Sequence, residues 1–398
     1  MHPDDTLQQS QTNWSRILIG LGVVAAIVTL IIAVFDSPRF FQVYLIGYLF
    51  WVEIAVGCLG LVMLNNLING RWLYPILRFA EAGARTMPLM ALLFLPIILG
   101  LGEIYPDWAG PEAEAMYGGK AFMLQPTFFV LRAFIYIAVW SFLSYVLTNW
   151  SYKRDQDGNA VSEDTMRNFS AVGMIFYVLT TSLAGFDWTM SLVPEFFSSA
   201  FGWAVLSRMF LAMVAFIILA LALYWDREPF ASVVNKQVTN DLGAVLLMAF
   251  LVWIYFYAIQ VIIIYSGNVS FNALWFDLRI ENGWRALTQL FAAVHAVILL
   301  LMLIPGIKGK RVNLVALAGV LLLLRAVELL WVVMPTYHSD LSIQAWDFAP
   351  VIAVGGFWLA ATLTIFSRHR ALPVHHPSLG AQDSAAGAAE AYTATETV

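Results

Sequence analysis

Long apolar runs are the feature that most constrains what this chain can fold into. They recur in blocks of about twenty residues or more, which at 1.5 Å per helical residue is the length needed to cross about 30 Å of hydrocarbon. Strands of a membrane β-barrel would instead alternate apolar and polar residues over about ten positions. Runs such as LIGLGVVAAIVTLIIAVF do not alternate. The sequence therefore predicts an all-α polytopic membrane protein.

Composition narrows the possible functions further. Of the 398 residues, 61% are hydrophobic and only 12% are charged, whereas roughly one-quarter are charged in soluble domains. No basic run suggests a nucleic-acid partner. The single cysteine, Cys58, lies in an apolar block, which excludes a disulfide framework, a CxxCH haem attachment and a cysteine-ligated iron–sulfur cluster. Any redox metal is therefore expected in a partner.

The apolar runs, interrupted by Pro, Gly, Asn and charged residues, predict ten membrane spans. Spans two to five and six to nine are expected to form two four-helix bundles, with a flanking helix at each end. A cytoplasmic segment (1–14) would precede the spans, and a cytoplasmic tail (368–398), disordered from about residue 379, would follow them. The predicted spans are 15–35, 40–67, 87–106, 125–148, 169–189, 200–225, 242–266, 284–305, 313–334 and 347–367.

The placement of Lys and Arg predicts the orientation, since positively charged loops stay on the cytoplasmic side. Fourteen of these residues fall in the N-terminal segment, the even-numbered loops and the C-terminal segment, and only four fall in the odd-numbered loops. This bias places both termini in the cytoplasm. It also requires an even number of spans, which agrees with ten.

The loops on the predicted outer side are rich in acidic and aromatic residues, notably in 105–119, 271–284 and 336–348. Trp and Tyr are common at membrane interfaces, where they anchor helices. An exposed aromatic and acidic surface would also suit a docking face for extramembrane subunits. The sequence leaves both interpretations open.

Charged and titratable side chains inside the predicted spans are the main candidates for function. Each charge costs at least about 2.5 kcal/mol to insert at the centre of a membrane helix, so a chain that keeps several must pair them or use them. Arg325 and Glu328, three residues apart, could pair on one helix face. Pairing alone does not account for a buried histidine. We expect a proton route formed by Glu53, Glu103, Asp187, His295, Arg325 and Glu328, with Arg132 and Arg208 as supporting charges.

These residues are expected at different depths, counted at 1.5 Å per residue from the helix ends. The outer polar cluster would contain Glu103, Asp187 and Arg208. The route to mid-membrane would contain Glu53, His295, Arg325 and Glu328. The inner half is expected to hold hydroxyls and aromatics but almost no charge.

Carboxylates and an imidazole suit proton transfer, including acceptance of the protons that a quinol releases on oxidation. A membrane haem held by two histidines is excluded, because only His295 of the six histidines lies in a span. The protein is therefore not expected to be a cytochrome b.

Three segments carry a resemblance to a known family. They are GFDWTMSLVPEFFSSAFGW at 185–203, IIIYSGNVS at 262–270 and RAVELLWVVMP at 325–335. The chain resembles the polysulfide-reductase and NrfD-like integral membrane subunits (NrfD/PsrC type). Within these it is most similar to the ActF subunits (quinone-binding subunit 2) of alternative complex III, a bacterial quinol:electron-acceptor oxidoreductase. The resemblance extends from about the second to the tenth span, and the DWxMSL segment is its most specific part.

The resemblance implies a subunit without a redox metal of its own, in the bacterial inner membrane, within a complex that oxidises menaquinol or ubiquinol near the outer surface. Such complexes serve respiratory or photosynthetic electron transport, with cytochrome c or another carrier as electron acceptor. Implied partners are a paralogous NrfD-like membrane subunit, an iron–sulfur subunit, multihaem cytochrome c subunits and small membrane-anchored subunits. This subunit type is considered proton-conducting or a second quinone-binding subunit. Side chains expected beside a quinone are Trp188, Glu195, Tyr255 and Tyr257.

Two positions depart from the family pattern. Family members commonly have Pro-His-Trp after the DWxMSL segment, whereas this chain has Pro194, Glu195 and Phe196. One titratable group near the outer ends of spans five and six is thereby lost, and a carboxyl group stands in its place. Glu328 occupies a position where Asp is expected, which keeps the carboxylate.

Two other function classes stay open at this point. A stand-alone secondary transporter would bind an ion or solute at its buried charges, and such proteins typically have helices broken by Gly or Pro at mid-depth. Here the prolines fall mostly near span ends or in loops, with Pro96 as an exception. A purely structural membrane anchor would use the same helices to hold peripheral redox subunits.

Overall fold

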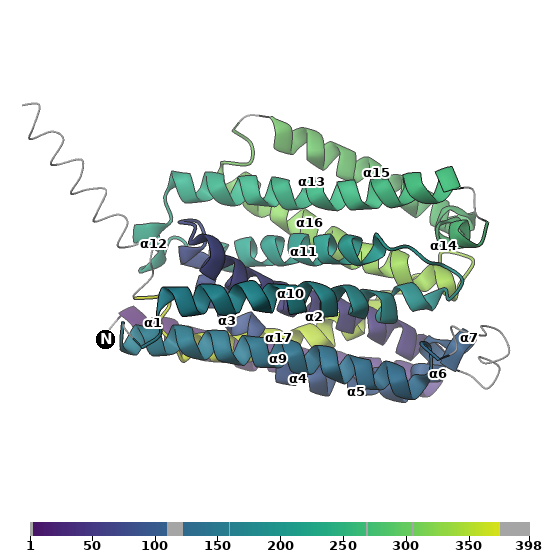
Figure 1. Cartoon of the computed structure of the whole chain (residues 1–398), viewed down its shortest axis with the longest axis horizontal. Coiled ribbons are helices and arrows are strands. Elements are labelled where there is room, and N and C mark those ends of the chain that lie inside the picture. The colour runs from purple at the N-terminus through teal and green to yellow at the C-terminus, as the bar shows by residue number, and fades with distance from the viewer. Residues whose placement is uncertain (1–2, 110–121, 159, 268–269, 305, 375–398) are drawn as a thin grey trace, which may run out of the picture.

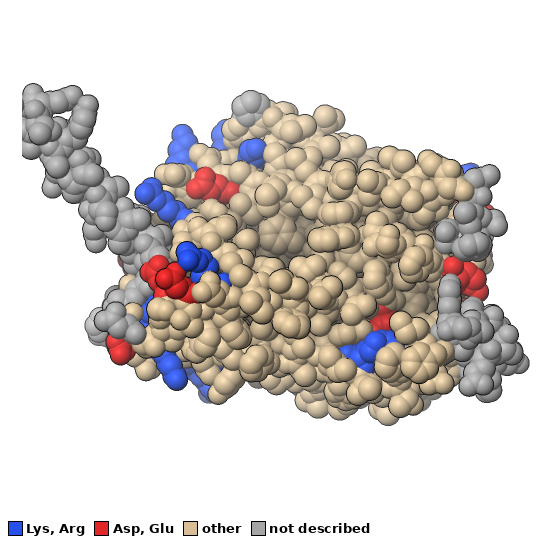
Figure 2. Space-filling view, in the orientation of Figure 1, with Lys and Arg blue, Asp and Glu red and all other residues tan. Residues whose placement is uncertain are grey.

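The computed structural model describes residues 3–109, 122–158, 160–267, 270–304 and 306–374. Within these ranges the regular structure is helical and contains no strand, and ten segments are long and apolar enough to cross a membrane. Figure 1 shows these helices packed side by side along one long axis. The face shown in Figure 2 has a broad uncharged belt, with charged side chains gathered mainly near its two ends. The prediction of an all-α, multi-pass membrane protein is confirmed.

The helices follow the predicted spans closely, apart from the third. The continuous spanning helices are α1 (Pro3–Phe35), α2 (Ser37–Ile68), α9 (Pro126–Gln156), α10 (Glu163–Trp188), α11 (Phe201–Ala222), α13 (Lys236–Gly267), α15 (Asn282–Leu303), α16 (Arg311–Val333) and α17 (Ala349–Ser367). Short connecting elements are α7 (Pro106–Ala109), α12 (Phe230–Val233), α14 (Ser270–Ile280), η3 (Met190–Leu192), η4 (Met334–Thr336) and η5 (Ala345–Phe348).

Local sequence signals set several of the helix ends. Asp36 caps α2 by accepting a hydrogen bond from the Arg39 backbone N–H, and Asn69 ends the same helix in the left-handed conformation at φ 46°. Asn tolerates this conformation better than most residues. Ser162 caps α10 in the same way as Asp36 caps α2.

The third span is broken, whereas the sequence predicts one helix over 87–106. Pro88 and Pro96 each stand in the first turn of a new helical piece, where the missing proline N–H is tolerated. The segment also starts well before residue 87. Its pieces are η1 (Tyr74–Ile76), α3 (Leu77–Ala84), α4 (Met87–Leu93), α5 (Leu95–Leu99) and α6 (Leu101–Ile104).

Helix α2 lies at the centre of the molecule and is buried along nearly all of its length. It packs against α3, α9 and α10 on one side and against α11 and α16 on another. The helices α11, α13, α15 and α16 pack among themselves as a second group. Helices α1 and α17 form an intimate pair beside α2. This packing matches the two predicted four-helix bundles with a flanking helix at each end.

The two ends of the bundle differ in what they carry. The N-terminal end of α1 and the C-terminal end of α17 lie at the same end (Figure 1), where the Ser15 hydroxyl contacts the Thr364 hydroxyl at 3.3 Å. We name this end the terminus side, and the opposite end, which holds α7, α14 and η5, the loop side. The sequence predicts that the terminus side faces the cytoplasm. The predicted disordered tail (379–398) and residues 110–119 of the first outer loop lie outside the described residues.

Many aromatic side chains of the loop side are buried within the protein. Trp108 donates its indole N–H to the Ser191 carbonyl at 3.0 Å, and Tyr105 donates its hydroxyl to the Trp188 carbonyl at 2.9 Å. Trp284 is buried and bonded to the His338 carbonyl at 2.8 Å. These side chains hold the loops onto the bundle. They therefore do not act as anchors at the lipid interface or form part of a docking surface.

Candidate functional site

Glu53 lies near the middle of α2 and forms an ion pair with Arg208 of α11. The Arg208 guanidinium donates to both carboxylate oxygens, with a Nε–Oε2 distance of 3.0 Å. A Cβ on Gly57, one turn further along α2, would meet the Met213 side chain at 2.7 Å. The glycine therefore lets α11 approach α2 closely enough for a two-pronged contact, which is the strongest ion-pair geometry available to these side chains.

A second buried network joins α13, α15 and α16. Arg325 bonds to the Glu328 carboxylate three residues further along α16, so the local pair anticipated from the spacing is present. The Trp253 indole N–H donates to the same carboxylate at 3.0 Å, and the Arg325 guanidinium lies over the Trp253 ring at 4.0 Å from its centroid. Arg325 also reaches His295 on α15.

The partners of His295 define which ring nitrogen carries the proton. Its Nδ1 lies 2.6 Å from the Phe291 carbonyl, which can only accept, so Nδ1 is the donor. Its Nε2 faces Arg325, which can only donate, so Nε2 carries a lone pair. His295 is therefore the neutral Nδ1–H tautomer, held in place from both sides.

The two networks meet at the junction of the two helix groups. Glu53 lies within electrostatic range of Arg325 and Glu328, and Tyr257 of α13 bonds to Glu328 and lies near Arg208. We name the five residues Glu53, Arg208, His295, Arg325 and Glu328 the central cluster; each is at most 5% exposed. Two carboxylates balance two guanidinium groups, and His295 is neutral. The cluster is thus uncharged overall, as a buried site at this depth requires.

Asp187 and Arg132 form a separate pair nearer the loop side. Arg132 of α9 donates to both Asp187 oxygens, at 2.7 and 2.8 Å, and the Tyr136 hydroxyl donates to the same carboxylate at 2.8 Å. The Arg132 and Asp187 side chains are only partly buried, whereas Tyr136 is buried. Glu103 is exposed on α6. The expected outer cluster of Glu103, Asp187 and Arg208 is therefore wrong as a grouping, because each of the three has a different environment.

The four side chains expected beside a quinone do not converge. Trp188 is buried next to the Glu53–Arg208 pair, and Tyr257 belongs to the surroundings of Glu328. Tyr255 is 57% exposed on the outer surface of α13. Glu195 lies near Asp107 on the loop side, where burial raises the pKa of Asp107 and the Glu195 carboxylate raises it further.

A buried charged cluster near the terminus side was not anticipated. Arg78 on α3 bonds to the carboxylates of Glu81 and Asp155 and to the Ser151 hydroxyl, the last at 3.1 Å. Arg78 and Glu81 are 2% and 1% exposed. The expectation of almost no charge in this half is therefore wrong. The two charges in the segment LRFAEAGA favour a loop by hydropathy. Its Arg and Glu are nevertheless three residues apart among apolar residues, which is the same spacing that predicts an ion pair in RAVE at 325–328.

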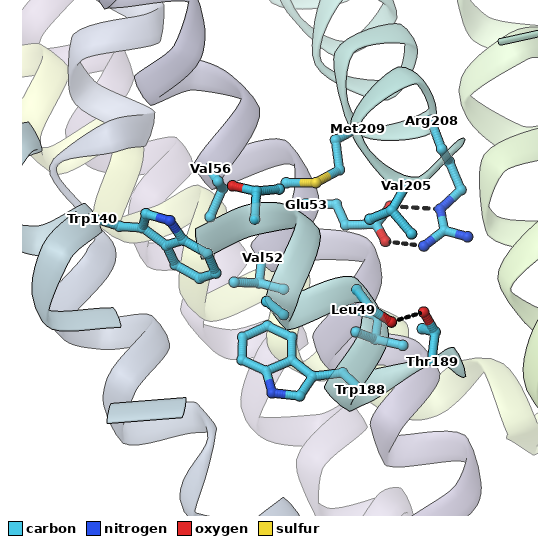
Figure 3. A pocket seen from close by; sticks show the side chains of 13 residues that line it. Leu49, Val52, Glu53, Val56, Trp140, Trp188, Thr189, Val205, Arg208 and Met209 are labelled. Atoms are coloured by element: carbon cyan, nitrogen blue, oxygen red, sulfur yellow. Dashed lines mark hydrogen bonds and ion pairs between the residues drawn. The ribbon is translucent and has the colours of Figure 1, made fainter. Parts of the chain in front are cut away.

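A small cavity adjoins the Glu53–Arg208 pair. Its volume is about 20 Å³, which is room for one water molecule. Figure 3 shows Trp140 and Trp188 on one side of it and the ion pair on the other. The Thr181 hydroxyl and the Trp188 indole N–H, which belong to its walls, are buried without a hydrogen-bond partner among the described residues.

Comparison with known proteins adds no assignment to this geometry. No protein-family model matches the chain, and no curated protein matches it. Among the described residues, no group of three or more His, Cys, Asp or Glu side chains is arranged to hold a metal ion. The features of the described residues that bear on function are the central cluster, the cavity and the charged cluster near the terminus side.

Proposed function

We propose that this chain is a membrane subunit of a quinol-oxidising electron-transport complex of the alternative complex III type, and that it conducts protons through the central cluster. The observation that carries the proposal is the meeting of two buried acid–arginine pairs and a neutral histidine at the junction of the two helix groups. Such groups are expensive inside a membrane and are usually retained for function.

The central cluster has the components that a proton relay needs. A carboxylate released from its arginine can take up a proton, and the arginine can then bond to the neighbouring carboxylate. The Nε2 lone pair of His295 can accept a proton once the Arg325 guanidinium turns away. Because Glu53 and Glu328 lie within electrostatic range of each other, protonation of one favours ionisation of the other.

The quinol and the redox partners enter the proposal through the sequence resemblance. The cavity beside Glu53, at about 20 Å³, suits water and is too small for a quinone ring. The Arg132–Asp187 pair is nearer the loop side and partly exposed, so it is the better position for contact with a quinol headgroup from the lipid. Haem and iron–sulfur clusters would belong to partner subunits on the loop side, with both termini in the cytoplasm.

The proposal is tested by isolating the chain with its natural partners. A tagged copy, expressed at its natural level and extracted in mild detergent, should co-purify with haem-containing subunits that oxidise a quinol. In proteoliposomes, Glu328→Gln should lower the number of protons moved per electron, and Glu328→Asp should restore it in part. Asp164→Asn, at an exposed carboxylate, is the matched control. A colourless chain without partners would refute the assignment to an electron-transport complex.

The broken third span favours one alternative, a secondary transporter, because discontinuous helices often frame solute sites. Here the break after α3 is closed by protein groups: the Thr86 hydroxyl donates to the Gly83 carbonyl at 2.6 Å and accepts from the Trp358 indole at 2.7 Å. The same purification separates the two functions, since a transporter would be isolated without haem and would take up solute alone. A structural anchor would co-purify with haem but tolerate Glu328→Gln.

A further inference from the structure

The charged cluster near the terminus side lies at the start of a line of buried hydroxyls. Ser151 on α9 bonds to Arg78 at 3.1 Å and also to the Glu81 carboxylate. Thr148 and Ser144 follow at spacings of three and four residues, which places all three hydroxyls on one face of α9. Each of these side chains is at most 3% exposed. The face covers about 10 Å along the helix axis at 1.5 Å per residue.

One hydroxyl on this face of α9 can still donate and accept hydrogen bonds. Thr148 accepts from the Arg85 guanidinium at 2.6 Å and donates to the Ser144 carbonyl at 2.7 Å. The Ser144 hydroxyl is buried and has no hydrogen-bond partner among the described residues. A buried hydroxyl without a partner costs about 1–3 kcal/mol. Water is the molecule that most commonly satisfies such groups.

The same helix face continues to the cavity beside Glu53. Trp140, four residues before Ser144, forms part of the cavity wall and donates to the Thr180 hydroxyl at 2.9 Å. The cavity holds two further buried polar groups without partners in the described structure, the Thr181 hydroxyl and the Trp188 indole N–H. Together with the Glu53 carboxylate they provide the two to four polar contacts that an internal water needs.

We propose that water binds at the Ser144 hydroxyl and in the cavity beside Glu53, so that this line of polar groups connects Glu81 to Glu53 and forms a path for protons from the terminus side to the central cluster. Water is the ligand that fits, because the cavity admits one small molecule and its polar groups both donate and accept hydrogen bonds. Each hydroxyl or water accepts one proton and passes on another, so no reactant is consumed. The use of the path in transport depends on the proposed function, but its hydration does not.

Cysteine accessibility tests the path directly, because Cys58 is the only cysteine of the chain. In a Cys58→Ala background, Ser144→Cys, Thr148→Cys and Thr181→Cys replace small polar groups along the path. Leu143→Cys is the matched control. Leu143 immediately precedes Ser144 on α9, is buried, and packs towards Gly173 of α10. Silver ions and a small cationic thiosulfonate are applied to membrane vesicles of each orientation. Only a thiol that meets water ionises and reacts readily.

The path cysteines should react about tenfold faster than the control, since reactivity follows thiolate formation, and faster when the reagent is added from the terminus side. Equal rates for the path and control positions, or reaction from the loop side only, would overturn the proposed path. Finding no haem-bearing partners would overturn the proposed function and leave these rates unchanged. In the intact complex, Glu81→Gln should slow proton uptake from the terminus side, and Glu81→Asp should restore it in part.

Discussion

The Glu53–Arg208 pair gives the sharpest quantitative prediction. Both side chains are at most 5% exposed and joined by two hydrogen bonds. Opposite charges about 4 Å apart at an effective dielectric constant of about 20 attract by about 4 kcal/mol. Removal of one member of a buried pair destabilises proteins by about 3–5 kcal/mol, because the other charge is left uncompensated. We therefore expect Glu53→Gln and Arg208→Met each to lower the free energy of unfolding by about 3–5 kcal/mol.

The double variant removes both charges and so relieves most of this penalty. Its free energy of unfolding should exceed the value expected from adding the single effects by about 3 kcal/mol. The measurement is equilibrium unfolding of the purified chain in mixed micelles of increasing sodium dodecyl sulfate content, followed by tryptophan fluorescence. A cycle at Asp164 and Arg167, an exposed pair, is the control and should show coupling below about 0.5 kcal/mol. Coupling at Glu53 and Arg208 no larger than in that control would refute the buried pairing.

Three further predictions address packing, hydrogen bonding and pH. Gly47→Ala should destabilise the chain strongly, since a Cβ there would meet the Pro350 backbone at 2.7 Å, and the detergent-unfolding midpoint should fall. Trp253→Phe removes a hydrogen bond of 3.0 Å to the carboxylate of α16 and should cost about 1.5–3 kcal/mol in the same assay. Burial, and then the neighbouring Arg39 guanidinium, lower the pKa of His338 below its usual 6.5. The neutral form is therefore favoured in the folded state, so its stabilising contribution is present above pH 6.5 and is lost as the pH falls below that value. His338→Gln should flatten the dependence of unfolding on pH between about 7 and 5, and an unchanged slope would show that another group is responsible.

Hydropathy carried most of the fold prediction, because a helix that crosses a bilayer must be apolar over its whole length. The third span shows where this rule fails. Its first piece, α3, contains Arg78 and Glu81, and because of these two charges hydropathy predicts a loop there. In the fold the Arg78 guanidinium forms ion pairs with both the Glu81 and the Asp155 carboxylates, so the charges of this segment are buried with partners. A window average of hydropathy does not register such compensation between residues distant in sequence.

Of the contacts within the central cluster, the sequence predicted one and missed another. The Arg325–Glu328 pair follows from helical spacing alone, since residues three apart share a face. The Arg208–Glu53 pair joins residues 155 positions apart, and depth counting assigned the two residues to different clusters. The tautomer of His295 depends on the Phe291 carbonyl and on Arg325 of another helix. No sequence pattern reports either contact.

The long apolar runs by themselves determined that this chain is helical, multi-pass and divided into about ten spans, because hydrocarbon accepts only backbones whose hydrogen bonds are satisfied within each segment. They also determined that a few charges would be buried at a cost. Which charges meet was decided by the tertiary structure alone. Pairing depends on the rotation and the close approach of helices, as Gly57 permits for α2 and α11, and these are set by side-chain packing between distant segments and not by the hydropathy of either helix.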